Sequence, residues 1–309
     1  MVGPSGEQFE IAAGGYRAVV TECGATLRSF AYGDRALLDG FGAHEMASAG
    51  RGQLLAPWVN RIRDGRYELD GSSFQLALTE VARRNASHGL VRWAAWSLEE
   101  RTANSVSLVC RLMAQSGYPW TLDLHALFDV SADGLTVTVT ATNQSGSEAP
   151  YAVGAHPYLR VGDGPVDGLE LTLPAGTRLL TDPERKLPTG TEPVDGTEFD
   201  FRASRPIRAT VLDHAFTDLV RDAQGRATTV LLDPATGDGV ALWVDERHHW
   251  IQVYSGEESP ATARRSLAVE PMTAPPDAFN SGTDLVRLAP AGSPGDEHSA
   301  SWGIRALHS

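Results

Sequence analysis

Hydrophobic and polar residues alternate with a period of two along most of the chain. In the run from Leu135 to Ala141 every second residue is aliphatic, and the residues between them are threonines. Successive side chains of a β-strand point to opposite faces, so this pattern predicts a half-buried strand. Similar runs flank Asp70 and Gly71 and flank the turn-rich segment 233–239, and both arrangements predict β-hairpins.

Helical periodicity is scarce and predicts only a turn or two near residues 213–219. Turn residues recur about every 8–12 positions, which is typical of sandwiches and barrels. The predicted class is therefore all-β, with antiparallel sheets and few short helices. Because no internal repeat or break in composition divides the chain, we expect one domain over residues 1–309, with a loop-rich stretch at about 160–210 and a frayed polar segment around 292–299.

Composition narrows the possible partners. A chain of 309 residues with 42% hydrophobic content can bury a sizeable core. Its net charge of −13 argues against nucleic acid and against an anionic membrane surface, so a neutral small molecule fits better. No export signal and no apolar run long enough to span a membrane is present, which favours the cytoplasm. A monomer and a homodimer both stay open.

Few residues suggest metal or covalent chemistry. Cys23 and Cys110 stand alone in strand-like runs and are interpreted as buried thiols, and no Cys/His cluster predicts a metal site. No phosphate-binding, dinucleotide-binding or Gly-x-Ser-x-Gly nucleophile motif is present. Lys186 is the only lysine of the chain, and it leaves Schiff-base catalysis with a single candidate in a loop.

His156 is the first candidate for catalysis. It precedes a proline, which keeps its backbone extended, and alternation places it on one face with Ala152 and Gly154. That face is free of bulky side chains. The alternative is a structural histidine, which is the commoner role of a single histidine.

Glu270 stands in a similar context. It also precedes a proline and shares a strand face with Ala268, whereas Leu267 and Val269 should point to the core. It is either a solvated charge at a sheet edge or a positioned base. Together with His156 it would supply the acid and the base that general acid/base chemistry requires.

Two further segments carry groups that suit sugar hydroxyls. Asn60 and Arg61 follow Trp58 and combine an amide, a guanidinium and an aromatic ring, although Arg61 could be a surface residue paired with Asp64. Asp213 could accept hydrogen bonds from two hydroxyls, or it could only cap the short helix expected after it.

Several short segments, in their order along the chain, resemble the aldose 1-epimerase (galactose mutarotase) family over nearly the whole length. They are APWVNRI (56–62), HG (88–89), GYP (117–119), HPYL (156–159), LDHAF (212–216), QVYSG (252–256) and VEPMTAPPDAFNSG (269–282). The resemblance implies a β-supersandwich with a sugar on its open concave face and with no metal or organic cofactor. It also implies roles: His156 as general acid and Glu270 as general base, with the sugar-hydroxyl ligands Arg61, His88 and Asp213 and the further binding positions Asn60 and Gln252.

The substrate is less defined than the reaction. Met272 stands where the common family form has glutamine after Glu-Pro, and the surrounding string is similar to a bacterial branch that includes mutarotases proposed to act on the sulfonated hexose sulfoquinovose. Arg83 and Arg84 are candidates for holding such an acidic group. We favour a neutral aldohexose such as galactose or glucose, with a sulfoquinovose-preferring enzyme as the alternative.

Two other classes of function compete with a mutarotase. A non-catalytic sugar-binding or regulatory module on the same fold would keep Arg61, His88 and Asp213 but would not need Glu270. A carbohydrate lyase or a glycosidase is the second rival, and a glycosidase would need two carboxylates about 5–9.5 Å apart, for which Glu270 and Asp213 are the candidates. Sugar cleavage, rather than anomer exchange, distinguishes this last class.

Overall fold

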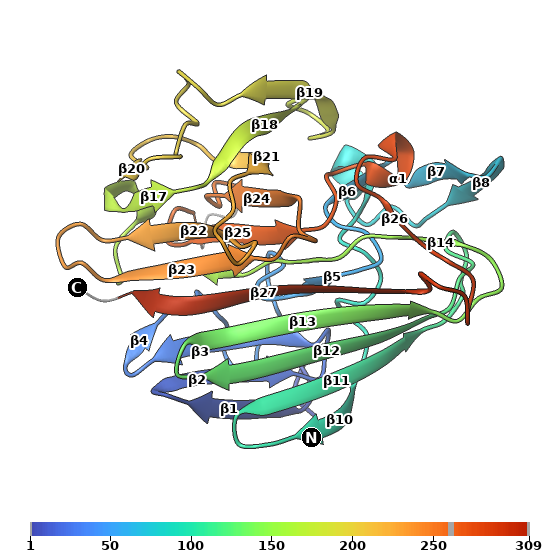
Figure 1. Cartoon of the computed structure of the whole chain (residues 1–309), viewed down its shortest axis with the longest axis horizontal. Coiled ribbons are helices and arrows are strands. Elements are labelled where there is room, and N and C mark those ends of the chain that lie inside the picture. Colours follow the sequence, from blue (N-terminus) through green and yellow to red (C-terminus); the bar gives the residue numbers. More distant parts are fainter. Residues whose placement is uncertain (1, 259–262, 308–309) are drawn as a thin grey trace.

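Two large antiparallel sheets organise the protein. The computed structural model describes residues 2–258 and 263–307, so the outermost residues of the predicted domain, 1 and 308–309, lie outside the described part. In these ranges the first sheet has nine strands, which run side by side across the middle of Figure 1. In sheet order they are β10 (Ser97–Arg101), β11 (Ser105–Leu112), β12 (Leu122–Ser131), β13 (Gly134–Asn143), β27 (Glu297–Leu307), β23 (Gly239–Val244), β22 (Ala227–Leu232), β17 (Glu170–Thr172) and β20 (Arg205–Pro206).

The second sheet, with eight strands in the described residues, carries most of the functional positions discussed below. Its order is β19 (Pro188–Pro193), β18 (Ala175–Thr181), β21 (Asp213–Leu219), β24 (Trp250–Tyr254), β25 (Leu267–Met272), β15 (Gly154–Ala155) and β5 (Leu54–Leu55), with β16 (Tyr158–Leu159) also paired to β25. The central strand β25 is buried along its whole length. Residues on β21, β24 and β25 are therefore held by strand pairing on both sides.

Smaller elements close the two ends. A four-stranded sheet of β1 (Gln8–Ala13), β2 (Tyr16–Thr21), β3 (Thr26–Tyr32) and β4 (Arg35–Ala36) lies behind β11–β13 in Figure 1. Three strand pairs complete the described part: β6 (Arg61–Arg63) with β9 (Asn85–Ser87), β7 (Arg66–Leu69) with β8 (Ser72–Gln75), and β14 (Ala149–Tyr151) with β26 (Val286–Leu288). The helical segments described are α1 (Ala278–Ser281) and single turns at Val81–Arg83 and Val166–Gly168.

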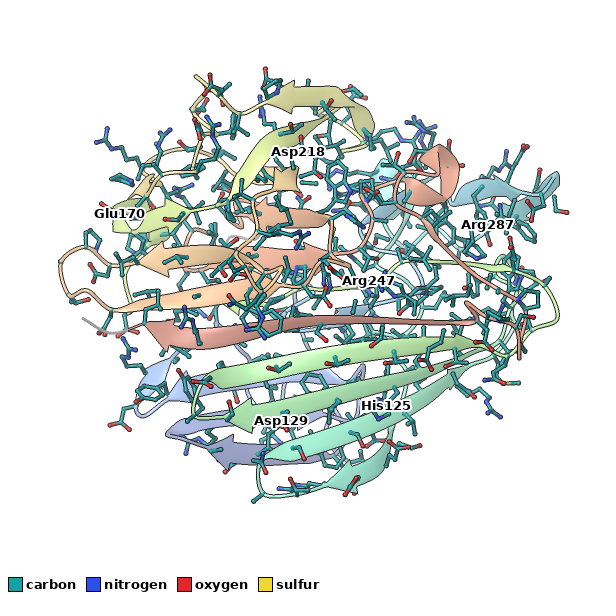
Figure 2. The ribbon with its side chains drawn as sticks, in the orientation of Figure 1. His125, Asp129, Glu170, Asp218, Arg247 and Arg287 are labelled. Carbon is teal, nitrogen blue, oxygen red and sulfur yellow. The ribbon has the colours of Figure 1, made fainter. Side chains whose placement is uncertain are left out.

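Alternation along the long strands builds the core. Every second residue of β12 and β13 is buried, and these residues join one apolar cluster that extends from Phe9 to Ala306. The opposite face of β12 carries polar side chains, among them His125 and Asp129 (Figure 2). The strand predicted from Leu135 to Ala141 and both predicted hairpins are confirmed.

The helix predicted near residues 213–219 is wrong, because this segment is strand β21. β21 pairs with β18 on one side and with β24 on the other, so its backbone groups are satisfied by neighbouring strands. Such tertiary pairing outweighs a weak local pattern. The interpretation of Asp213 as a helix cap fails with the helix.

Other expectations need correction in part. The segment at 160–210 contains four strands, β17 to β20, of which β19 and β20 are sheet edges where proline is tolerated. The polar segment around 292–299 ends in β27, which begins at Glu297. The run from Tyr151 to His156 is not one strand, because β14 ends at Tyr151 and β15 holds only residues 154 and 155. Cys23 and Cys110 are free but half-buried.

Gly154 allows β15 to lie against β25. A Cβ added at this position would meet the Pro271 carbonyl oxygen at 2.5 Å and the Val59 side chain at 2.9 Å. Both neighbours belong to the packed interior, so neither can move aside freely. The absence of a side chain at Gly154 thus fixes the distance between the strand that leads into His156 and the strand that carries Glu270.

Replacing Gly154 with alanine is therefore expected to destabilise the protein. We expect the free energy of unfolding, measured in urea, to fall by about 1–3 kcal/mol because of the overpacked contact. Gly190→Ala in the edge strand β19 is the matched control: no described atom lies within 4 Å of a Cβ placed there, and we expect a change within about 0.5 kcal/mol. Equal stability of the two variants would contradict the role assigned to Gly154.

Candidate active site

The seven site residues predicted from the sequence surround one cavity of about 370 Å³. They are Asn60, Arg61, His88, His156, Asp213, Gln252 and Glu270. They come from chain segments as far apart as residues 60 and 270: the second sheet carries Asp213, Gln252 and Glu270, and the β6–β9 pair carries Arg61 and leads to His88. The cavity wall also includes Glu80, Arg92, Trp93, Tyr158, Tyr254 and Glu258.

Three neighbouring strands set a row of polar groups on this wall. Gln252 of β24 stands directly opposite Glu270 of β25 in the strand register. Paired residues of adjacent strands point to the same side of a sheet, so their side chains emerge together. On the other side of β24, Asp213 of β21 accepts a hydrogen bond from the Gln252 side chain at 3.1 Å. The sheet therefore orders one amide between two carboxylates.

Glu270 is buried rather than solvated at an edge, since only 2% of its surface is exposed. Its Oε2 atom is buried and has no hydrogen-bond partner among the described residues. Burial, together with the nearby charge of Asp213, raises the pKa of Glu270 well above the ordinary carboxyl range, although Arg61 acts in the opposite direction. A buried carboxyl group with a free oxygen is a candidate for proton transfer.

His156 follows β15 and is held on both sides. Its ring stacks on Tyr158 with centroids 5.0 Å apart and planes inclined by 16°. On another side lies Gly50, where an added Cβ would meet the ring at 2.9 Å. The backbone N–H of His156 donates to the carbonyl of Gln53 at 3.0 Å. The imidazole is thus fixed by packing, while its buried Nδ1 has no hydrogen-bond partner in the described part of the chain.

His156 and Glu270 are in direct contact, with Nε2 and Oε1 3.3 Å apart. Burial lowers the pKa of His156 to about 3 and raises that of Glu270, so the cavity disfavours the charged form of each group. These opposite displacements favour a neutral pair that shares one proton, with the proton on the carboxyl group at rest. Moving it from Oε1 to Nε2 creates a carboxylate base and an imidazolium acid without uptake of a proton from solvent.

Arg61 is ordered by an acidic partner in the wall, and this partner is not Asp64. Its Nε and Nη2 atoms donate to the two carboxylate oxygens of Glu80 at 2.8 and 3.0 Å, and Nη1 donates to Asn60 Oδ1 at 3.1 Å. Asp64 pairs with Arg185 instead. This fork-to-fork geometry fixes the guanidinium plane and leaves further N–H groups available to a ligand.

His88 adopts the left-handed backbone region, with φ of 63°, directly after strand β9. Its ring meets that of His156 edge to face at 5.5 Å. Burial, and next the neighbouring His156, hold the pKa of His88 well below its usual value, so the ring is neutral. A neutral imidazole can both donate and accept a hydrogen bond.

The sequence analysis missed Arg92, which lines the cavity beside Trp93. Its guanidinium lies 5.7 Å from the Trp93 ring centroid, and in residues 2–258 and 263–307 it has neither a hydrogen-bond nor an ion-pair partner. Arg83 and Arg84 do not line the cavity; Arg83 pairs with Glu80 and Glu258. The available sequence signal was the position of Arg92, four residues after His88.

Solved structures show which class of protein shares this fold. The GalM/aldose epimerase homologue from C. elegans superposes with a TM-score of 0.86 at 20% identity, covering 98% of this chain and 99% of that chain. Galactose 1-epimerase from Lactobacillus acidophilus superposes with a TM-score of 0.80 at 19% identity, covering 96% and 92%. The fold is thus a galactose mutarotase-like β-supersandwich, as predicted from the sequence.

The chain belongs to the aldose 1-epimerase family, whose model matches residues 7–301. A relative in Escherichia coli K12, the uncharacterized protein YihR, is 37% identical over 285 residues, which cover 92% of this chain and 89% of that protein. Human galactose mutarotase is 28% identical over 160 residues, which cover 49% and 45% of the two chains.

The described residues contain neither a candidate metal centre nor a membrane-spanning helix. No three His, Cys, Asp or Glu side chains gather among them in a way that could hold a metal ion. None of the described helices combines the length and the apolar character needed to cross a membrane.

The shared proton leads to a prediction about pH. A second proton enters the pair only near the lowered pKa of His156, about 3, so kcat/KM for anomer exchange should stay level from about pH 7 to pH 5. The raised pKa of Glu270 places the loss of the shared proton on the alkaline limb. Polarimetry corrected for the uncatalysed rate, with circular dichroism at each pH as a folding control, measures the profile. A fall by half between about pH 7 and 5 would contradict the shared-proton arrangement.

Proposed function

We propose that this protein is an aldose 1-epimerase that interconverts the α and β anomers of a free aldohexose. The contact of His156 with Glu270, buried in a cavity large enough for a sugar, carries this proposal. Each of these groups keeps one buried polar atom without a described partner. A purely sugar-binding module would not require a proton-sharing pair, so the arrangement favours an enzyme.

In the proposed reaction Glu270 accepts the proton of the C1 hydroxyl while His156 delivers a proton to the ring oxygen. The C1–O5 bond breaks as the C1=O1 bond forms, which gives the open-chain aldehyde. Rotation about C1–C2 then presents the other face of the carbonyl, and the reverse transfers close the ring. Protons and electrons balance within one turnover, because each group returns to its starting state.

The other wall residues would hold the sugar. Asp213 and Gln252 offer acceptors and a donor along the strand row. Arg61 offers N–H groups whose directions are fixed by its pair with Glu80, and Asn60, whose Oδ1 accepts from Arg61, offers its amide N–H groups. Neutral His88 could donate or accept. These interactions would orient the reacting atoms toward His156 and Glu270, which is where positioned acid/base groups gain their effect.

An anionic hexose such as sulfoquinovose is the second candidate substrate, and Arg92 is the observation that favours it. A partly buried guanidinium without a described acidic partner can be matched by a negative substituent on the ligand. Arg92 therefore takes the place of Arg83 and Arg84 as the candidate for binding an anionic substituent, because Arg83 is already paired with Glu258 and neither of the two lines the cavity. The net negative charge of the protein acts at long range and is screened beyond about 8–10 Å.

Glu270→Gln tests the proposed base while preserving its shape. We expect kcat to fall by about 10² or more, with sugar affinity changed only severalfold, because the amide cannot accept the hydroxyl proton. His156→Ala should lose a comparable amount. Nuclear magnetic resonance exchange between the anomers of galactose and glucose provides the readout.

A matched control lies on the outer face of the nine-stranded sheet, where His125 and Glu99 form an exposed pair with a separation of 2.9 Å. Glu99→Gln and His125→Ala should keep full activity. Near-normal turnover in Glu270→Gln would refute the assignment, and release of cleaved sugar from a glycoside would replace it with a glycosidase.

Arg92→Met tests the choice between neutral and anionic sugars. If Arg92 pairs with the substituent, wild-type protein should prefer sulfoquinovose over glucose by about tenfold to a hundredfold, and the variant should lose this preference while keeping its rate on glucose. Arg111→Met is the control, because Arg111 pairs with Asp123 on the outer face of the large sheet. Equal rates on both sugars, unaffected by Arg92→Met, would leave the neutral aldohexose as the substrate.

A further inference from the structure

The single lysine of the chain contacts a wall residue of the cavity. Lys186 Nζ lies 3.0 Å from Asp213 Oδ2, and the two side chains are only 24% and 18% exposed. The other carboxylate oxygen of Asp213 accepts a hydrogen bond from the Gln252 side chain. Each oxygen of Asp213 therefore has a partner, and its side chain is fixed between a cation and an amide.

Lys186 reaches this place through a tight turn, residues 182–187, that joins β18 to β19. The Asp182 side chain accepts the backbone N–H groups of Arg185 and Leu187 at 2.6 and 3.1 Å. Lys186 donates its own N–H to the Asp182 carbonyl at 3.0 Å and has a left-handed φ of 56°. The turn is closed on itself, which is why Lys186 has a defined direction rather than that of a free surface side chain.

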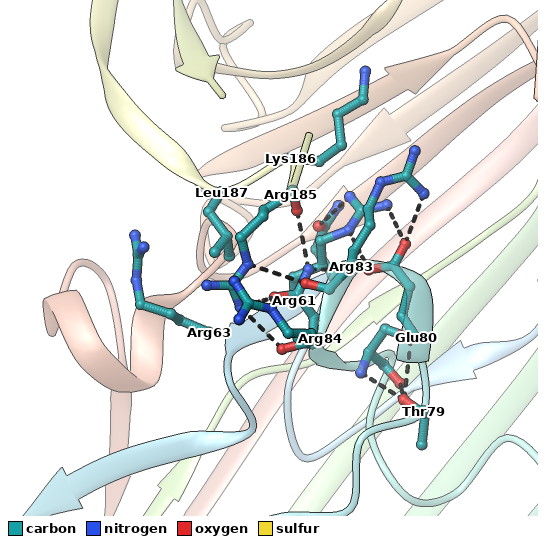
Figure 3. A network of polar contacts seen from close by, with 12 residues as sticks. Arg61, Arg63, Thr79, Glu80, Arg83, Arg84, Arg185, Lys186 and Leu187 are labelled. Carbon is teal, nitrogen blue, oxygen red and sulfur yellow. Dashed lines mark hydrogen bonds and ion pairs between the residues drawn. The ribbon is translucent and has the colours of Figure 1, made fainter. Parts of the chain in front are cut away.

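Arg185, the preceding residue, attaches this turn to the segment 83–85, which lies between the wall residues Glu80 and Ser87 in the sequence. Its guanidinium donates to the carbonyl oxygens of Arg83 and Arg84 and to the side chains of Asn85 and Asp64, at distances from 2.8 to 3.2 Å. Asn85 belongs to β9, the strand that leads to His88. Figure 3 shows Arg185 directed into this network, whereas Lys186 points away from it. The turn 182–187 is thus anchored on one side and supports Asp213 on the other.

We propose that Lys186 is a positioning residue of the active site, which holds Asp213 for the sugar and offsets its charge beside Glu270. The inference rests on the proposed mutarotase function. Lys186 is not among the described residues that line the cavity, so it would act through Asp213 rather than by touching the substrate. The turn 182–187 is accordingly a functional part of the site.

The role of Lys186 can be measured through the pKa of Glu270, which depends on the charges around it. Asp213 raises the pKa of Glu270 and Arg61 lowers it, His156 contacts it, and Tyr158 lies near enough to interact with its charge. His88, Arg92 and Tyr254 line the same cavity. Removing the positive charge next to Asp213 leaves its negative charge less compensated. The pKa of Glu270 should then rise further, and the alkaline limb of the pH profile should move to higher pH.

Lys186→Met removes the charge and keeps much of the apolar stem. We expect kcat/KM on galactose to fall by about tenfold, which is typical of losing a charge-assisted contact, together with an upward shift of the alkaline limb. Lys186→Arg should restore most of both, because a cation near Asp213 is what the site requires. Arg202→Met is the control, since Arg202 pairs with Asp195 and Asp200 on the surface of the same region. Thermal unfolding of each variant excludes misfolding.

A normal rate and an unchanged pH profile in Lys186→Met would overturn the inference. A lower rate with an unchanged profile, not restored by Lys186→Arg, would also overturn it, because a merely structural role produces that result. If wild-type protein fails to exchange anomers, the proposed function falls, and the dissociation constant for galactose in wild type and Lys186→Met judges the lysine instead. Weaker binding in the variant then supports the positioning of Asp213, and equal binding or no binding contradicts it.

Discussion

The contact between His156 and Glu270 is the constraint on which the rest of the site depends. The imidazole and the carboxyl group lie 3.3 Å apart in a wall that lowers the pKa of His156 and raises the pKa of Glu270, and so disfavours the charged form of each. Such a pair is poorly tolerated in an interior unless its members share a proton or meet a polar ligand. The buried atoms that they leave without described partners, Glu270 Oε2 and His156 Nδ1, are groups that the hydroxyls of a bound sugar would satisfy under the proposed function. The two-sheet scaffold keeps the pair in place through strand pairing around β25.

The strand pairing also explains why the site is divided among so many segments. The second sheet supplies Asp213, Gln252 and Glu270 from adjacent strands, and the β6–β9 pair supplies Arg61. Each contribution lies at a strand or directly after one, where packing fixes the direction of the side chain. The turn 182–187 lies outside the cavity wall, where Arg185 pairs with Asp64 and Lys186 pairs with the wall residue Asp213.

Much of this arrangement could be predicted from the sequence, but not all of it. Alternation identified β13 because its buried face repeats every second residue, and the turn residues between neighbouring runs identified both hairpins. It failed for β21, where both Ala215 and Phe216 are buried and the pattern is broken. The motifs around His156 and Glu270 pointed to the residues that meet in the cavity. Arg92 and the pairing of Arg61 with Glu80 could not be read, because they depend on which segments the fold brings together.

The packing of His156 between Tyr158 and Gly50 has a consequence for the identity of its two nitrogens. One face of the ring stacks on Tyr158, and Gly50 lies so close that even one extra carbon there would meet the ring at 2.9 Å. In this orientation Nε2 is the ring nitrogen in contact with Glu270. Under the proposed function, the nitrogen that faces the base would therefore be selected by the shape of the wall rather than by charge, and a glycine is one of the residues that set this shape.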